Sequence, residues 1–149
     1  MTDNRDYACA IGTAILAFNE TETEIFGLME ALAGADLPPD IEAGYLRDKL
    51  KYLKESAPRI ADAIVRQMVL EIVAEAERLN DDRNNFAHSL LWTDLFDGTR
   101  HRRWVRQKTK EATHDSRTPE QIMKVAEELE ELGNRAGALA SQIRVSGGR

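Results

Sequence analysis

The strongest constraint on the fold lies near the end of the chain, where apolar residues recur in alternating steps of three and four. The series is Ile122, Val125, Leu129, Leu132, Ala136, Leu139 and Ile143. This spacing gathers the side chains into one stripe of an α-helix, and such a stripe has to be buried against other elements. Thr118 and Gln121 match a capping box around Pro119, which suits the first helical position. The sequence therefore predicts a long helix from Pro119, with a frayed tail after residue 145.

The same spacing predicts three earlier helices. The first covers about residues 5–32. The second begins near Pro39 and ends before Pro58, which suits the first turn of a third helix. The third continues toward Trp92, and its weak helix formers at residues 80–82 predict a kink or break.

Four amphipathic helices with short connections indicate an all-α protein, and we expect an up-and-down four-helix bundle. Residues 93–117 interrupt the helical pattern, and Asp97-Gly98 is a turn signal. We expect a short irregular or hairpin insertion there, before the last helix. A chain of 149 residues suits one core, so residues 1–149 are predicted to form a single domain.

Composition and charge exclude several classes of protein. Hydrophobic residues make up 42% of the chain and charged residues 31%, which is typical of a globular protein. The net charge of −6 argues against a uniformly basic nucleic-acid-binding protein. The single cysteine, Cys9, excludes an intrachain disulfide framework and a multi-cysteine zinc site. The weakly polar run at residues 7–18 is too short for a membrane span, and the residues before it are too acidic for a signal peptide. We expect a cytoplasmic protein without membrane association.

The residues with the clearest chemical potential lie near the end of the third predicted helix, in the string Arg83-Asn84-Asn85-Phe86-Ala87-His88. Asn84 and His88 are four residues apart and share a helix face. An imidazole moves protons near neutral pH, while a guanidinium binds phosphate and stabilises the charge that grows in the transition state. An amide orients either group. These residues suit attack of an RNA 2′-hydroxyl on the adjacent phosphate without a metal or other cofactor.

With this motif the chain resembles the HEPN superfamily of small helical domains. The family motif is an arginine, a polar residue and a histidine after about four to six intervening residues. Arg83, Asn84 and His88 match it with four. The resemblance implies a helical bundle with the motif late in a long helix. It also implies a metal-independent endoribonuclease, often a toxin or defence protein, that works as a homodimer bringing two motifs together. Other members of the family have lost activity and serve as binding modules.

A basic segment follows the motif at residues 100–110, which contain no acidic residue. An aromatic ring among cations suits stacking on the bases of single-stranded RNA. The alternative is that this segment is an exposed hairpin, whose positive charges balance the negative charge of the rest of the protein. The residues predicted to contact RNA are Arg100, Arg102, Arg103, Trp104, Arg106 and Lys108, with Lys110 adding a further charge.

Glu22 falls on the otherwise apolar face of the first helix. A buried carboxylate is costly unless it is paired, so we predict that Glu22 supports the motif by contacting Arg83 or His88. The alternative is that Glu22 reaches water at the rim of the bundle.

Two functions of different class are consistent with these residues. The first is the ribonuclease. The second is a non-catalytic helical interaction module, such as the partner of a toxin or a defence complex, in which Arg83, Asn84 and His88 form a satisfied polar network. A metal site is not expected, because the spacing of His88, His101 and His114 matches no zinc pattern. For the ribonuclease we expect a homodimer, single-stranded RNA as substrate, and an antitoxin or other protein as a partner.

Overall fold

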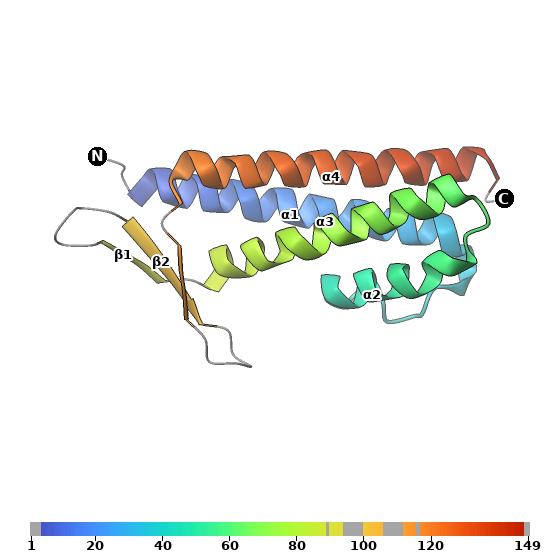
Figure 1. Cartoon of the computed structure of the whole chain (residues 1–149), viewed down its shortest axis with the longest axis horizontal. Coiled ribbons are helices and arrows are strands. Elements are labelled where there is room, and N and C mark those ends of the chain that lie inside the picture. Colours follow the sequence, from blue (N-terminus) through green and yellow to red (C-terminus); the bar gives the residue numbers. More distant parts are fainter. Residues whose placement is uncertain (1–3, 89, 94–99, 106–111, 116, 148–149) are drawn as a thin grey trace.

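The computed structural model describes residues 4–88, 90–93, 100–105, 112–115 and 117–147, with side chains for residues 4–86 and 117–147. It shows a bundle of four α-helices that carries a small antiparallel sheet at one end (Figure 1). The elements are α1 (Asn4–Ala33), α2 (Leu46–Ser56), α3 (Ala63–His88), β1 (Leu90–Thr93), β2 (Arg100–Val105), β3 (Ala112–Asp115) and α4 (Pro119–Val145). The expected helical bundle, with an insertion before the last helix, is confirmed. None of the helices in the described residues is long and apolar enough to cross a lipid bilayer.

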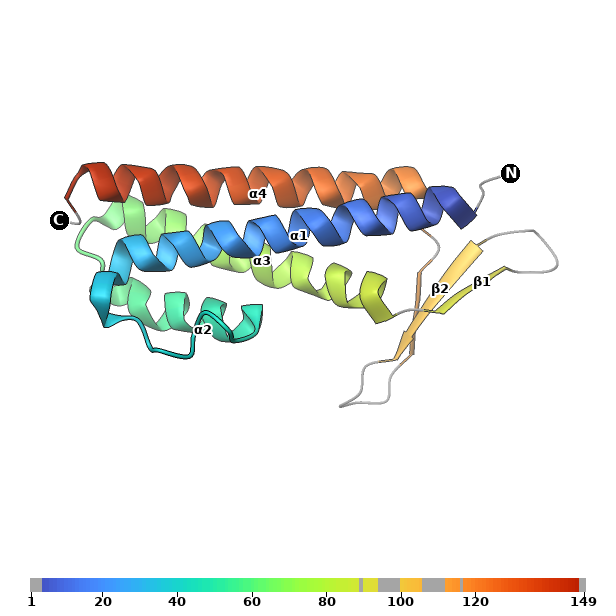
Figure 2. The ribbon, with the colours of Figure 1, turned by 180° about the vertical axis from the view of Figure 1, so that it is seen from behind.

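Helices α1, α2 and α4 run in the same direction, and α3 runs against them (Figures 1 and 2). The direction of α2 departs from a strictly alternating up-and-down order because residues 34–45 return along the bundle before α2 begins. Gly34 ends α1 with a φ of +56°, a left-handed conformation that few other residues adopt at low cost. As a result, the beginning of α2 lies beside the middle of α1, where Phe18 and Glu22 face Leu46.

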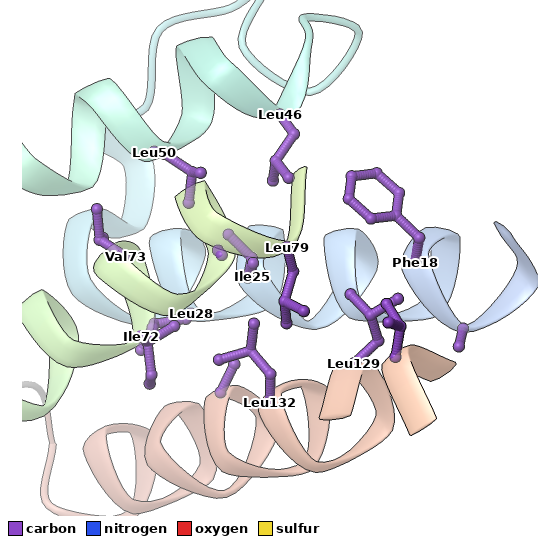
Figure 3. Packing of buried hydrophobic residues seen from close by; sticks show 14 of the residues in the cluster. Phe18, Ile25, Leu28, Leu46, Leu50, Ile72, Val73, Leu79, Leu129 and Leu132 are labelled. Atoms are coloured by element: carbon purple, nitrogen blue, oxygen red, sulfur yellow. The ribbon is translucent and has the colours of Figure 1, made fainter. Parts of the chain in front are cut away.

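The core lies mainly between α1, α3 and α4. The seam predicted on α4 is buried along its whole length, and Ile25 and Leu28 of α1 are fully enclosed against it. Figure 3 shows Leu79 of α3 and Leu132 of α4 directed into this space. Helix α2 adds Leu46, Leu50 and Leu53 from one side. Burying each such side chain stabilises the fold by about 1.5–3 kcal/mol, so the apolar stripes hold the bundle together.

Helices α1 and α4 approach each other closely at Gly133. The Thr21 hydroxyl lies 2.8 Å from the carbonyl oxygen of Ala17 and 2.7 Å from that of Leu129, within hydrogen-bond distance of both. A Cβ atom added at Gly133 would lie 3.1 Å from Thr21 Oγ1 and 3.3 Å from Thr21 Cα. Glycine is therefore needed here because the two backbones approach each other closely.

Two helices begin later than the sequence predicts. Helix α2 begins at Leu46 rather than near Pro39, because turns closed by hydrogen bonds from Ile41 N to Pro38 O and from Gly44 N to Ile41 O occupy the preceding residues. Pro58 lies in a short 3-10 turn, Ala57–Arg59. Helix α3 then begins at Ala63, where Asp62 Oδ1 accepts hydrogen bonds from the amides of Ile64 and Val65.

Helix α3 continues without interruption through residues 80–82, so the break expected there is absent. It ends at His88 instead of continuing to Trp92, because the next residues pair with β2. Leu90 lies opposite Arg103 in this antiparallel pair. The third strand pairs on the other side of β2, giving the order β1-β2-β3. The expected hairpin is therefore a small sheet that extends beyond the end of α3 (Figure 1).

Candidate functional site

The motif residues lie in the last turns of α3. Arg83 and Asn84 face the beginning of α2 and the middle of α1, whereas Asn85 points into the core and is 5% exposed. His88 is the final residue of α3, four positions beyond Asn84, and its side chain lies outside the described residues. The structure thus brings Arg83 and Asn84 to one surface of the bundle.

The guanidinium of Arg83 is half-buried and has few partners. Its Nη1 donates a hydrogen bond to Asn84 Oδ1 at 3.2 Å, and its Cζ lies 5.2 Å from the centre of the Phe18 ring in a cation–π contact. Its Nε is buried and has no hydrogen-bond partner in the part of the chain that the structure describes. Among the described side chains, no carboxylate pairs with Arg83.

Five other arginines of the described bundle pair with carboxylates, and three of them do so at 3.2 Å or less. The hydrogen bond that Arg78 donates to Glu128 raises the pKa of Arg78, because the carboxylate favours the charged guanidinium. Among the described side chains, Arg83 is instead a partly desolvated cation without an anionic partner, and binding an anion would offset the cost of its burial. The three shorter pairs are Arg78 with Glu128 at 2.6 Å, Arg135 with Glu75 at 3.2 Å and Arg117 with Asp82 at 2.9 Å.

Arg83 forms part of the wall of a cleft with a volume of about 360 Å³. The cleft opens between the middle of α1, the beginning of α2 and the last turns of α3. Its size falls within the range of small-ligand sites, about 300–1,000 Å³. Its lining residues are Phe18, Glu22, Gly44, Tyr45, Leu46, Arg47, Asn80, Arg83 and Asn84.

Glu22 lies in this cleft, but its ion-pair partner is Lys49 of α2. Lys49 Nζ lies 2.7 Å from Glu22 Oε1 and donates a second hydrogen bond to the carbonyl oxygen of Gly44 at 2.8 Å. No hydrogen bond or ion pair joins Glu22 to Arg83 among the described side chains. The predicted contact with Arg83 is therefore replaced by one with Lys49, because the return of the chain after α1 places α2 directly over Glu22. A contact with His88 stays a prediction, since that side chain lies outside the described residues.

The ion pair sets both the shape and the charge of the cleft. By holding the Gly44 carbonyl, Lys49 fastens the segment that carries Tyr45 and Arg47 at the rim. Tyr45 is 79% exposed, and the Arg47 side chain is 71% exposed with its one carboxylate neighbour, Asp48, at 3.8 Å. Because Lys49 pairs with Glu22, the guanidinium groups of Arg47 and Arg83 leave an excess of positive charge among the described residues that line the cleft.

The residues predicted to contact RNA lie partly on β2. Arg100, Arg102, Arg103 and Trp104 belong to this strand, while Arg106 and Lys108 lie outside the described residues. Strand β2 is the centre of the sheet, with Arg102 opposite both Leu91 and Asp115. The sheet begins two residues after His88, so the basic strand and the motif share one end of α3. Contact of this strand with RNA stays a prediction.

The histidines other than His88 lie in the sheet, His101 on β2 and His114 on β3. Their side chains are outside the described residues. Within the part of the chain whose side chains are described, no group of three or more histidine, cysteine, aspartate or glutamate side chains is arranged to hold a metal ion.

The sequence analysis does not predict a site role for Phe18, Tyr45 and Arg47, which line the cleft, or for Lys49, which pairs with Glu22. Lys49 does carry a signal, because it lies three residues after Leu46 and four before Leu53, on the apolar stripe of α2. Tyr45 and Arg47 carry none, since a helix expected to begin at Pro39 places them in its interior rather than at its start.

No protein-family model matches the sequence, and no match is found among curated proteins or among solved structures. The function of the chain has to be inferred from its own residues.

Proposed function

We propose that the protein is a metal-independent endoribonuclease of HEPN type, a homodimer whose catalytic residues are Arg83, Asn84 and His88. The observation that supports the proposal most strongly is the environment of the Arg83 guanidinium. This group is half-buried in the wall of a cleft, it contacts Asn84, and it has no carboxylate partner among the described side chains. A phosphodiester supplies the missing anion and accepts paired hydrogen bonds from a guanidinium. In HEPN proteins such an activity often serves a toxin or defence system, with an antitoxin as partner.

The proposed reaction is attack of the ribose 2′-hydroxyl on the adjacent phosphate. The bond from the 2′-oxygen to phosphorus forms as the bond to the 5′-oxygen breaks, which yields a 2′,3′-cyclic phosphate and a 5′-hydroxyl. His88 takes the proton from the 2′-hydroxyl or donates one to the leaving oxygen, and a second copy in the dimer does the other. Arg83 binds the phosphate and stabilises its growing charge, and Asn84 orients the phosphate or the imidazole. Strand β2 adds salt-sensitive affinity for single-stranded RNA.

The test is cleavage of single-stranded RNA by the purified protein in the presence of EDTA. We expect wild-type activity that is insensitive to EDTA, and a loss of about 100-fold or more in His88→Ala and in Arg83→Ala, because each removes a group that acts in the transition state. Arg78→Ala is the matched control. It removes the same charge from the same helix, but Arg78 is paired with Glu128 and does not line the cleft.

Circular dichroism and thermal melting of each variant separate lost chemistry from lost folding. Activity that survives His88→Ala, or activity that falls equally in Arg78→Ala, would contradict the proposed roles. A protein inactive on structured and unstructured RNA alike would favour the interaction module.

One contact favours that second function. Arg83 joins α3 to α1 through its cation–π contact with Phe18, as expected of a residue in a structural network. If this contact is the main role of Arg83, Arg83→Ala lowers the melting temperature. His88→Ala then makes no difference to RNA cleavage, because the wild-type protein does not cleave RNA. The catalytic role predicts the opposite pattern, with Arg83→Ala folded and inactive.

A further inference from the structure

We propose that Tyr45 and Arg47, at the α2 rim of the cleft, form a binding subsite for one nucleotide of single-stranded RNA next to the scissile phosphate. In this subsite the ring of Tyr45 stacks on the base and the guanidinium of Arg47 contacts the phosphate. The inference rests on the proposed function, since it places the substrate of that same site.

The first support is the position of Tyr45. It is the residue that precedes the first turn of α2, where short polar residues are strongly preferred, and its side chain makes no capping hydrogen bond. Its ring adds little to the core, because the residue is 79% exposed. Folding therefore does not explain a tyrosine here, whereas a flat exposed ring at the edge of a cleft suits stacking on a base.

The second support is that the backbone beneath this ring is fixed. The carbonyl of Tyr45 accepts hydrogen bonds from the amides of Asp48 and Lys49, at 2.9 and 3.3 Å. The carbonyl of Gly44 is held by the Lys49 ammonium, which is itself buried and paired with Glu22. The Tyr45 ring thus stands on a rigid base, which lowers the entropic cost of binding a ligand.

The third support is the charge of the two walls. Arg47 and Arg83 both line the cleft, and among the described residues the one carboxylate that lines it, Glu22, is neutralised by Lys49. Two cations that border one cleft suit successive phosphates of a nucleic-acid backbone. The amides of Asn80 and Asn84 line the same cleft and offer donors and acceptors to a base edge. Cations, an aromatic ring and amides together favour single-stranded nucleic acid over an acidic peptide, which has no base to stack.

The experiment measures binding separately from cleavage. A short fluorescein-labelled 2′-O-methyl oligouridine lacks the attacking hydroxyl, so its anisotropy reports binding to the intact, full-length protein. We expect Tyr45→Ala to weaken binding about tenfold and Tyr45→Phe to retain it, because the stacking face is kept. Arg47→Ala should weaken binding several-fold and reduce the salt dependence by about one phosphate contact. Arg59→Ala, an exposed arginine just after the far end of α2, is the control and should bind as the wild type does.

The outcomes also separate this inference from the proposed function. Tyr45-dependent binding by a protein that cleaves no RNA would support the subsite and contradict the ribonuclease. Cleavage and binding that are both unchanged in Tyr45→Ala and Arg47→Ala would support the ribonuclease and overturn the subsite. Displacement of the oligonucleotide by an equal charge concentration of polyglutamate would also overturn it, because the cleft would then bind anions without recognising a base.

Discussion

At the scale of single residues, two charged side chains on apolar helix faces form an ion pair with each other. Glu22 stands on the apolar face of α1 and Lys49 on that of α2, where the lysine side chain is 4% exposed. Burying an ammonium costs several kcal/mol unless hydrogen-bonding partners replace the lost water. A carboxylate and a carbonyl do so here, and the same contacts fasten the rim of the cleft.

Lys49→Met should therefore lower the free energy of unfolding by about 2–3 kcal/mol, because Glu22 and the Gly44 carbonyl lose their partner. Adding Glu22→Gln to it should recover part of the loss, since the unpaired charge is gone. Urea denaturation of each variant measures both effects. Lys51→Met is the control, because its ion pair with Glu55 spans 3.9 Å between exposed side chains and contributes little. Equal stability of the Lys49 and Lys51 variants would contradict the argument.

The sequence predicts part of this arrangement. The place of Glu22 on an apolar face is enough to predict that the carboxylate needs a partner. It is not enough to identify Lys49, because that depends on the direction of α2, which the loop before it decides. The motif residues themselves are found by spacing alone, since Arg83 and Asn84 lie on one helix. That none of the described carboxylates pairs with Arg83 becomes visible only once the neighbouring helices are in place.

At the scale of elements, a helix boundary can be predicted where a single local signal determines it. The capping box predicted at Thr118 is present, with hydrogen bonds from Gln121 N to Thr118 Oγ1 and from Thr118 N to Gln121 Oε1. The start of α3 is missed because the sequence offers two signals for it. A proline such as Pro58 is favoured in the first turn of a helix, and an aspartate such as Asp62 is favoured at the N-cap. The end of α3 depends on pairing with β2, a contact distant in sequence, and no local pattern reports it.

The α1–α4 contact offers a matched pair of substitutions. Gly133→Ala should destabilise the protein by about 1 kcal/mol, because the new methyl group meets Thr21. The Thr21 hydroxyl is hydrogen-bonded and its Cα belongs to the packed backbone, so neither moves easily. At Gly137 the new Cβ would lie 2.5 Å from Glu24 Oε2, at the end of a side chain that can rotate into water. Gly137→Ala should therefore be neutral or stabilising by up to about 1 kcal/mol, because alanine is the better helix former.

Thermal denaturation of the two variants beside the wild type checks this pair. Opposite shifts are expected from the same chemical change four residues apart on one helix. A Gly133→Ala variant that melts above the wild type would show that α1 and α4 do not approach each other as closely as the structure has them.

At the scale of the whole molecule, the candidate chemistry extends from the middle of α1 to the end of the bundle that carries the sheet. The last turns of α3 line the cleft, and the end of α3 and the basic strand β2 follow one another along the molecule (Figure 1). This layout reflects the direction of α2, whose start points toward the sheet. A uniform up-and-down order would put that start, with Tyr45 and Arg47, at the opposite end. The periodic spacing of apolar residues was therefore enough to predict the helical bundle. It was not enough to predict the cleft, because the cleft depends on the turn-rich loop before α2, which has no such periodicity.

The last prediction concerns assembly, because one chain supplies a single motif histidine while the proposed reaction moves two protons. If a homodimer joins two copies of His88 in one site, a chain with His88→Ala disables any wild-type chain that it pairs with. Random exchange in an equal mixture then leaves about half of the wild-type chains in fully wild-type dimers. The activity of a fixed amount of wild-type protein should fall about twofold at that ratio and further with excess variant. Light scattering at tens of micromolar should report a dimer for both proteins. Activity that is independent of added variant, after exchange has been verified with a tagged chain, would mean that each chain works alone.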